Sequence, residues 1–155
     1  MKSSLILAAF LPLFLAACAT TKPAPLTLNT TSVQIVGTNA RLEKTAVEEH
    51  VGYWNNTNTF AQWSLKNLKP GTYNVKMIYS LDPQFPPSIV TVSARGQSLS
   101  ARLSNTKNWD DYHALDFGSI NIQNPSDSLL TVKATAKPGE FVMNLQQVIL
   151  TPQPH

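Results

Sequence analysis

Hydrophobic and polar residues alternate with a period of two through most of the chain after residue 25. This period directs apolar side chains to one face of an extended strand and polar side chains to the other. The alternation is clearest in four segments, residues 72–79, 90–94, 99–103 and 130–134. Each of these segments is therefore predicted to be a β-strand with one buried face and one solvated face.

Turn-forming residues separate the alternating segments. Gly, Pro, Asn and Asp, which favour tight turns, gather at residues 69–71, 95–97, 124–127 and 137–139. Residues 40–50 have the only helix-like composition, and they are too few and too charged on every side for a core helix. Short strands broken by regular turns predict an all-β fold, an antiparallel β-sandwich. We place it at residues 26–152, with Trp63 in its core.

The start of the chain has a different pattern. Lys2 precedes an apolar run at residues 5–15, and the run ends in Leu15-Ala16-Ala17-Cys18. This stretch resembles the lipobox of bacterial lipoproteins. The resemblance implies that residues 1–17 are a signal peptide that is removed, and that Cys18 receives a diacylglycerol and further acyl chains such as palmitate. Cys18 is the only cysteine, so it has no partner for an internal disulfide. The alternative is an ordinary signal peptide with a cysteine at the cleavage point by chance.

Residues 18–25 are rich in Ala, Thr, Lys and Pro and are expected to form a flexible tether behind the lipid. Ala19 follows the cysteine where an Asp commonly retains enteric-type lipoproteins at the inner membrane. The resemblance therefore implies the outer membrane, provided that the cell has one. Membrane contact is expected through the N-terminal lipid, because the mature chain has no second apolar run long enough to cross a bilayer.

Length and charge narrow the possible partners. The mature chain has room for one domain. Its formal net charge falls from +3 to +2 once Lys2 is removed with the signal. Its Lys and Arg residues are scattered and do not alternate with aromatic residues, so binding to nucleic acid is not expected. A glycan or an envelope protein is the expected partner.

Aromatic residues beside amides are the best candidates for a binding site. A sugar ring has apolar C–H faces and polar edges, so it binds an exposed aromatic side chain flanked by hydrogen-bonding groups. Tyr53, Trp54 and Trp109 are candidate platforms, and Asn144 is a candidate polar contact. Each of the three aromatic residues has about an even chance of belonging to the core instead. Two loops, residues 81–88 and 104–111, are also richer in Pro, aromatic and amide residues than simple turns need.

The order of short motifs resembles the galactose-binding-like β-sandwich domains. The similarity begins at Val51-Gly52-Tyr53-Trp54-Asn55-Asn56 and continues through Trp63 and residues 69–75, 109–112, 142–145 and 148–152. It is closest to the family-six-like carbohydrate-binding modules appended to sulfatases and fucosidases. The resemblance implies a jelly roll that holds a sugar between two aromatic residues, here Tyr53 and Trp109, with Asn144 as the polar contact. Asn144 could equally make a buried hydrogen bond that closes the sheet.

Metal binding and catalysis find little support in the sequence. The family-six-like modules often hold calcium through a Glu on the first strand, and residues 26–31 contain no carboxylate, so no metal and no cofactor is expected. Glu48-Glu49-His50 is interpreted as a solvated loop, and Asp110-Asp111 as an exposed turn. His113 has no nucleophile placed beside it by a known motif. The protein is therefore expected not to be an enzyme.

Two main hypotheses remain open, beside a third possibility, a hydrolase of unfamiliar type. The first is a lipid-anchored, non-catalytic protein that binds carbohydrate through its loop aromatics. The second is a structural or accessory lipoprotein that uses the same sandwich to contact another envelope protein, with the aromatics forming a flat apolar patch. The arrangement of Tyr53 and Trp109 in space discriminates between them.

Overall fold

The structure is a computed structural model that describes residues 24–154 apart from residue 47. The predicted signal peptide (1–17), Cys18 and most of the predicted tether (18–25) lie outside the described residues. Ala24 and Pro25 are exposed and lead directly into the first strand.

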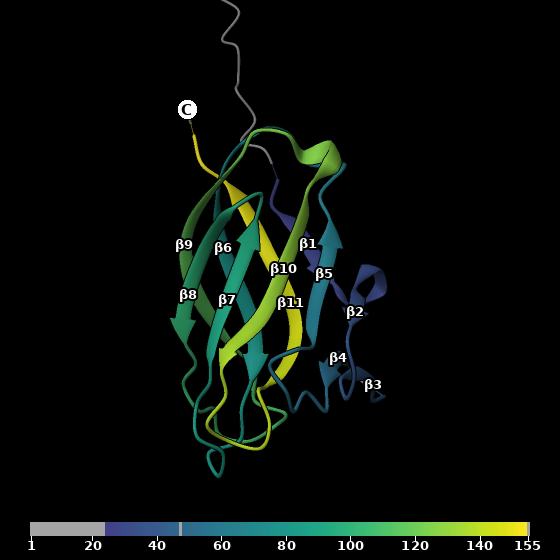
Figure 1. The fold of residues 1–155 in the computed structure, drawn as a ribbon, viewed down its shortest axis with the longest axis vertical. Coiled ribbons are helices and arrows are strands. Elements are labelled where there is room, and N and C mark those ends of the chain that lie inside the picture. The colour runs from purple at the N-terminus through teal and green to yellow at the C-terminus, as the bar shows by residue number, and fades with distance from the viewer. Residues whose placement is uncertain (1–23, 47, 155) are drawn as a thin grey trace, which may run out of the picture.

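The described chain folds into two antiparallel sheets packed face to face (Figure 1). One sheet, called sheet A here, has the order β3-β4-β11-β6-β9, with β1 paired to β11. Its strands are β1 (Leu26–Asn29), β3 (Arg41–Lys44), β4 (Glu49–Gly52), β6 (Gly71–Ser80), β9 (His113–Ile122) and β11 (Asn144–Pro152). The prediction of an all-β antiparallel sandwich is confirmed.

The second sheet, sheet B, has the order β2-β5-β10-β7-β8. Its strands are β2 (Gln34–Val36), β5 (Phe60–Ser64), β7 (Ile89–Ala94), β8 (Gln97–Arg102) and β10 (Leu129–Ala136). Two single-turn 3₁₀ helices complete the described elements, η1 (Thr30–Ser32) and η2 (Pro125–Asp127). The four strands predicted from alternation correspond to β6, β7, β8 and β10.

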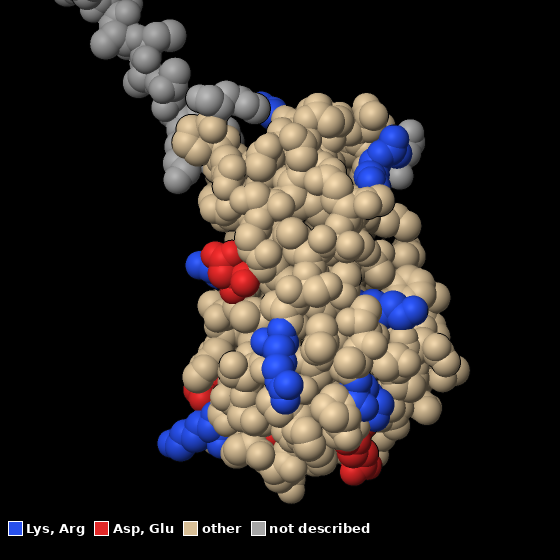
Figure 2. Space-filling model, turned by 60° about the vertical axis from the view of Figure 1, so that its left-hand side comes forward, with Lys and Arg blue, Asp and Glu red and all other residues tan. Residues whose placement is uncertain are grey.

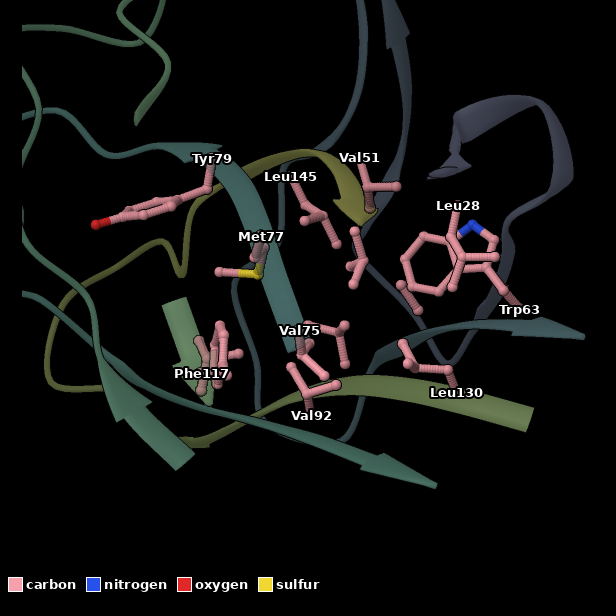
Figure 3. Close-up of a cluster of buried hydrophobic side chains, with 14 of the residues drawn as sticks. Leu28, Val51, Trp63, Val75, Met77, Tyr79, Val92, Phe117, Leu130 and Leu145 are labelled. Carbon is pink, nitrogen blue, oxygen red and sulfur yellow. The ribbon is translucent and has the colours of Figure 1, made fainter. Parts of the chain in front are cut away.

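The core lies between the inner faces of the sheets (Figure 3). Tyr73, Val75, Met77 and Tyr79 all point inward from β6, as the period of two predicts. Trp63 is 1% exposed, which confirms its assignment to the core, and its indole N–H donates to the Asn29 carbonyl at 2.8 Å. A buried indole needs such an acceptor, because an unpaired N–H in an apolar core costs free energy.

Residues 40–50, which the sequence left without a predicted element, contribute to a hairpin. Strands β3 and β4 pair, with Glu43 opposite His50, and Val51 of β4 pairs with Leu145 of β11. Val51 is 1% exposed, so the hairpin is attached to the sandwich by a buried side chain. Packing against a neighbouring strand overrides the local helix-like composition here.

Four connections gather at one end of the sandwich, the end at the bottom of Figure 1. We call it the loop pole and define it as residues 53–59, 81–88, 103–112 and 137–143. Backbone hydrogen bonds join the loops to one another, from Thr106 N–H to the Leu81 carbonyl at 2.8 Å and from Val142 N–H to the Trp54 carbonyl at 2.7 Å. The loops therefore form one connected surface.

Candidate functional site

Four aromatic side chains form a cluster at the loop pole. Phe141 is at its centre, with ring centroids 5.8 Å from Tyr53, 5.3 Å from Phe85 and 6.2 Å from Trp109. Phe85 and Trp109 also contact each other, at 5.5 Å. Tyr53 is 50% exposed, and the other three side chains are half-buried. We call these four residues the aromatic cluster.

Hydrogen bonds between loops hold the cluster together. The Asn105 side-chain amide donates to the carbonyls of Asp82 and Phe85, at 3.0 and 2.9 Å, and so ties residues 104–111 to residues 81–88. The Ser80 hydroxyl donates to the Trp109 carbonyl at 2.6 Å. These contacts place Phe85 and Trp109 side by side, although 24 positions separate them in the sequence.

Tyr53 leaves the end of β4 with an unusual backbone. Its φ is +57°, in the left-handed region that bulky residues rarely adopt. The turn directs the Tyr53 ring outward, where the Arg41 guanidinium lies over it at 4.1 Å from the centroid. Arg41 also donates twice to Glu43 Oε1, at 3.2 and 3.1 Å. Such local strain is found most often at functional sites.

A second group, polar and partly buried, lies on the outer face of sheet A. We call it the polar cluster and define it as Glu43, Glu48, His50, Tyr112 and Asn144. His50 is 6% exposed and has Nε2 3.4 Å from Glu43 Oε2. The Tyr112 hydroxyl is 3.0 Å from His50 Nδ1 and 3.2 Å from Glu48 Oε1. Glu48 and His50 share a face because they are two residues apart along one extended stretch.

Burial raises the pKa of the Tyr112 phenol well above its usual value, and the negative charge of Glu48 raises it further. Hydrogen bonds with Ser80 and Asn144 oppose this rise without cancelling it. The phenol therefore keeps its proton at neutral pH and can donate a hydrogen bond within the polar cluster.

Gly52 explains how Glu43 and Asn144 come together. A Cβ at Gly52 would overlap the Glu43 carboxylate and would lie 3.0 Å from both Asn144 Oδ1 and His50 Cδ2. The absence of a side chain therefore allows the carboxylate and the amide oxygen to converge above the sheet. Together they offer acceptors of the kind that sugar hydroxyl groups need.

The four predicted site residues lie in different environments in the structure. Tyr53 and Trp109 both belong to the aromatic cluster, but Phe141 lies between them, so they do not form a facing pair on their own. Asn144 lies in the polar cluster and is partly buried. Trp54 is 0% exposed, and its N–H donates to the Asn56 carbonyl at 3.2 Å. A fully buried indole presents no face to a ligand, so Trp54 is left out of the candidate site.

Sequence reasoning missed several residues of the site. The interpretation of residues 48–50 as a solvated loop was wrong, because Glu49 and His50 belong to β4 and His50 is buried. The alternation of Glu48 and His50 was a readable signal, but their partners Glu43 and Tyr112 depend on strand pairing. Phe141 had no signal beyond its place after a Pro-Gly turn.

Asp110 and Asp111 form a turn, as predicted. The backbone N–H of Lys107 donates to Asp111 Oδ2 at 2.9 Å, and His113 Nε2 lies 3.0 Å from the same oxygen. Asp110 is exposed and Asp111 is half-buried. The side chain of Asp111 therefore stabilises the loop that carries Trp109.

Two features are absent from the part of the chain that the structure describes. Residues 24–154, without residue 47, contain no group of three or more His, Cys, Asp or Glu side chains arranged to hold a metal ion. Within the same part of the chain, no helix is long and apolar enough to cross a membrane.

The fold is a galactose-binding-like jelly roll, the architecture of carbohydrate-binding modules. A family 35 carbohydrate-binding module from Clostridium thermocellum superimposes with a TM-score of 0.69 at 16% identity, covering 84% of this chain and 100% of the module. The C-terminal family 6 module of the laminarinase LamC from Zobellia galactanivorans gives a TM-score of 0.63 at 13% identity, covering 83% of this chain and 99% of the module.

A third similar structure is a complete enzyme, an exo-β-1,3-galactanase from Phanerochaete chrysosporium with bound β-1,3-galactotriose. It gives a TM-score of 0.66 at 13% identity, covering 83% of this chain but only 29% of the enzyme. By sequence, residues 28–154 match DUF5077, described as a domain of unknown function, and the chain belongs to that family. No curated protein matches the chain.

Proposed function

We propose that this domain binds a saccharide at the loop pole without converting it chemically. The observation that carries the proposal is the aromatic cluster, with the half-exposed Tyr53, at the end of the sheet that bears the polar cluster. An aromatic face beside convergent hydrogen-bonding groups matches the two kinds of surface on a sugar ring.

The roles within the site follow from exposure. Tyr53, as the most exposed ring of the aromatic cluster, is the stacking platform through the ring face that Arg41 does not cover, and Trp109 extends the apolar surface on the far side of Phe141. Asn144 and Glu43 accept hydrogen bonds from sugar hydroxyls, and Arg41 donates from above Tyr53. Binding is expected to be weak, because the surface is small and largely open to water.

The similar structures support this proposal because they are proteins that bind carbohydrate. Two are carbohydrate-binding modules, one of them the C-terminal module of a laminarinase, and the third is an enzyme with an oligosaccharide bound. All three structures are less than 20% identical to this chain, so their likeness supports the fold, and the proposed roles rest on this chain's own residues.

We further propose that the domain is displayed at the cell envelope. On this proposal residues 1–17 direct export, the Cys18 thiol carries the lipid, and residues 18–25 link the lipid to the sandwich. Several acyl chains hold a soluble domain stably at a bilayer, where a single chain binds only marginally. Mass spectrometry of the protein purified from its membrane would test the anchor. A Cys18→Ser variant that still carries acyl chains would contradict it.

The test of saccharide binding is a titration of the protein with a panel of oligosaccharides at millimolar concentration, followed by calorimetry or NMR. We expect Tyr53→Asn and Trp109→Ala each to weaken binding about two- to tenfold, since an aromatic ring contact contributes on the order of 0.5–1.5 kcal/mol. Asn is chosen at position 53 because it tolerates a positive φ.

Leu99→Ala, on β8 of the other sheet, is the matched control and should leave saccharide affinity unchanged. If none of the saccharides binds, or if the two aromatic variants bind as tightly as the unchanged protein, the proposal is wrong.

A second candidate function is contact with another envelope protein. It is favoured by the exposure of Leu42, at 45%, on β3, which is an edge strand of sheet A close to Tyr53. An exposed apolar residue on an open edge is suited to pairing with a second chain. Under this alternative, Leu42→Glu would abolish a cross-link to one defined envelope protein while leaving saccharide binding intact.

A further inference from the structure

The outer face of sheet B differs in charge from the rest of the molecule. None of its five strands contains an Asp or a Glu, whereas sheet A contains Glu43, Glu49 and Asp116. In both sheets alternate side chains point away from the core. The two outer faces therefore present different chemistry to the solvent.

Strand register arranges the outward side chains of sheet B in rows. One row crosses all five strands and consists only of amides and hydroxyls, because the paired positions run Gln34, Gln62, Thr131, Ser93 and Ser98. Gln62 donates to Gln34 at 3.0 Å. Neighbouring strands are about 4.8 Å apart, so the row extends for roughly 19 Å.

Hydroxyl groups continue into the next row. Thr91 Oγ1 is 2.7 Å from Ser100 Oγ and 3.3 Å from Thr135 Oγ1. Beside these rows the surface is hollowed into an open depression of about 400 Å³ at the β7–β8 turn. Its lining includes Ser93, Arg95, Gln97, Ser98 and Thr131.

Three cations border these rows. Arg95 lines the depression, Lys133 projects from β10 and Arg102 projects from β8. Among the described side chains, no carboxylate lies within 4 Å of any of the three, since the ion pairs found involve Arg41, His50 and His113. On the face shown in Figure 2, several Lys and Arg side chains likewise have no Asp or Glu beside them among the described residues.

We infer that the outer face of sheet B is a second binding surface, and that its ligand is an anionic polysaccharide, a hydroxyl-rich chain carrying sulfate or carboxylate groups. The rows of amides and hydroxyls exchange hydrogen bonds with the sugar hydroxyls. The three unpaired cations attract the acidic groups, and no strand of the face contributes a charge that would repel them.

This surface is separate from the loop pole. The depression, with Arg95, is at the turn between β7 and β8, whereas both strands meet the loop pole at their other ends, at Ile89 and Arg102 (Figure 1). Of the three cations, Arg102 alone adjoins the loop pole, so the second surface extends from the depression along sheet B toward that end. Loss of one binding activity can therefore be measured independently of the other.

The experiment uses the full chain with two probes of equal length, dextran sulfate and uncharged dextran, at about 0.1 M salt, where the Debye length is about 10 Å. Dextran sulfate should bind to sheet B, whereas dextran should not bind there, even if it binds at the loop pole. Combining Arg95→Gln, Arg102→Gln and Lys133→Gln should weaken binding about tenfold, because exposed charge pairs contribute up to about 1 kcal/mol each. Binding should also weaken steeply with added salt.

The matched control neutralises three exposed cations outside sheet B, by Lys44→Gln, Lys76→Gln and Lys107→Gln. It should change affinity no more than about twofold, as expected when distant exposed charges are screened by salt. Tyr53→Asn should leave dextran sulfate binding unchanged, which separates this surface from the proposed saccharide site. In NMR spectra, shifts on titration should fall on sheet B. If the combined variant fails to fold, Lys133→Gln alone should still lower the affinity.

Three outcomes would overturn the inference. Equal loss of affinity in the two triple variants would mean that only net charge matters. Shifts confined to the loop pole would place the ligand there instead. Binding to vesicles of anionic phosphatidylglycerol without binding to dextran sulfate would assign the surface to a membrane.

Discussion

Gly37 occupies a position that no other residue can take without moving its neighbours. Its φ is +112°, and a Cβ there would lie 2.8 Å from the Thr59 backbone and 2.6 Å from the Thr59 hydroxyl. That hydroxyl accepts the Thr38 N–H at 2.9 Å and donates to the Thr38 carbonyl. A side chain would therefore separate two segments that a hydrogen-bond pair holds together.

We predict that Gly37→Ala lowers the free energy of unfolding by about 3 kcal/mol, the sum of an unfavourable backbone conformation and a steric overlap. Gly96→Ala is the matched control, because Gly96 also has a positive φ, +78°, but has open space around it. It should cost only about 1 kcal/mol. Urea denaturation of both variants measures the difference, and equal losses would show that the overlap at Gly37 is relieved at little cost.

The adjacent residues Tyr53 and Trp54 show what sequence can and cannot predict at this scale. Both were candidate platforms, because both are aromatic and followed by amides. In the structure Tyr53 is 50% exposed and Trp54 is 0% exposed. Because Tyr53 has a positive φ, its side chain points away from that of Trp54. A tyrosine rarely adopts a positive φ, so the sequence did not predict this conformation.

At the level of elements, the hairpin of β7 and β8 is the one whose local sequence predicts its structure well. Its two turn residues, Arg95 and Gly96, have φ values of +46° and +78°. A two-residue turn with both values positive matches the right-handed twist of the strands it joins. The Arg-Gly-Gln signal and the alternation on both sides were therefore sufficient to predict this element.

The positive φ of Arg95 is unfavourable for an Arg residue, whereas Asn adopts such a conformation more readily. We predict that Arg95→Asn raises the free energy of unfolding by about 0.5–1 kcal/mol. Arg102→Asn in β8 removes the same charge without relieving a strained backbone, so it should give no gain. Thermal and urea unfolding of the two variants would check this. A gain of equal size in both would attribute the effect to charge instead.

The hairpin of β3 and β4 shows the opposite case. Its sequence is charged and helix-like, and its strand form depends on pairing with β11 through Val51 and Leu145. The polar cluster depends on that pairing as well, because Glu43 meets His50 only when β3 and β4 are in register. Long-range pairing of this kind is not encoded in any short segment, so the site was predicted only in part.

For the molecule as a whole, the sandwich was predictable because burial on one face of each strand is repeated along the entire chain. Two buried tyrosines, Tyr73 and Tyr79, and the half-buried Tyr112 have hydroxyls that make specific hydrogen bonds. Tyr73 donates to the Lys69 carbonyl at 2.6 Å, and Tyr79 donates to the Ser104 carbonyl at 2.9 Å. Burial raises the pKa of Tyr73, Tyr79 and Tyr112, although backbone hydrogen bonds oppose the rise for the first two.

This shared shift predicts a loss of global stability at alkaline pH. A raised pKa means that the folded state holds the phenol proton more tightly than the unfolded chain. The corresponding stability is fully present below about pH 10, the pKa of an unperturbed tyrosine, and is lost as the pH rises through the higher pKa of the folded state. Urea unfolding measured between pH 7 and pH 11.5 should show this decline.

Tyr112→Phe provides the control for that decline. At neutral pH the variant should be about 1 kcal/mol less stable, since the hydroxyl contacts with Glu48 and His50 are removed. The difference in the free energy of unfolding between the variant and the unchanged protein should become smaller above pH 10. There the stabilisation from the raised pKa of Tyr112 begins to be lost. A constant difference across the whole range would contradict the assignment.

The pairing of β1 with β11 has a geometric consequence. Leu26 lies opposite Leu150, so the described chain enters and leaves the sandwich at the same end, which is opposite the loop pole (Figure 1). Any segment attached before β1 or after β11 therefore joins the sandwich at the end opposite the loop pole, and the aromatic cluster faces away from that segment. Whatever surface the domain is mounted on, its tip is presented to the medium beyond that surface.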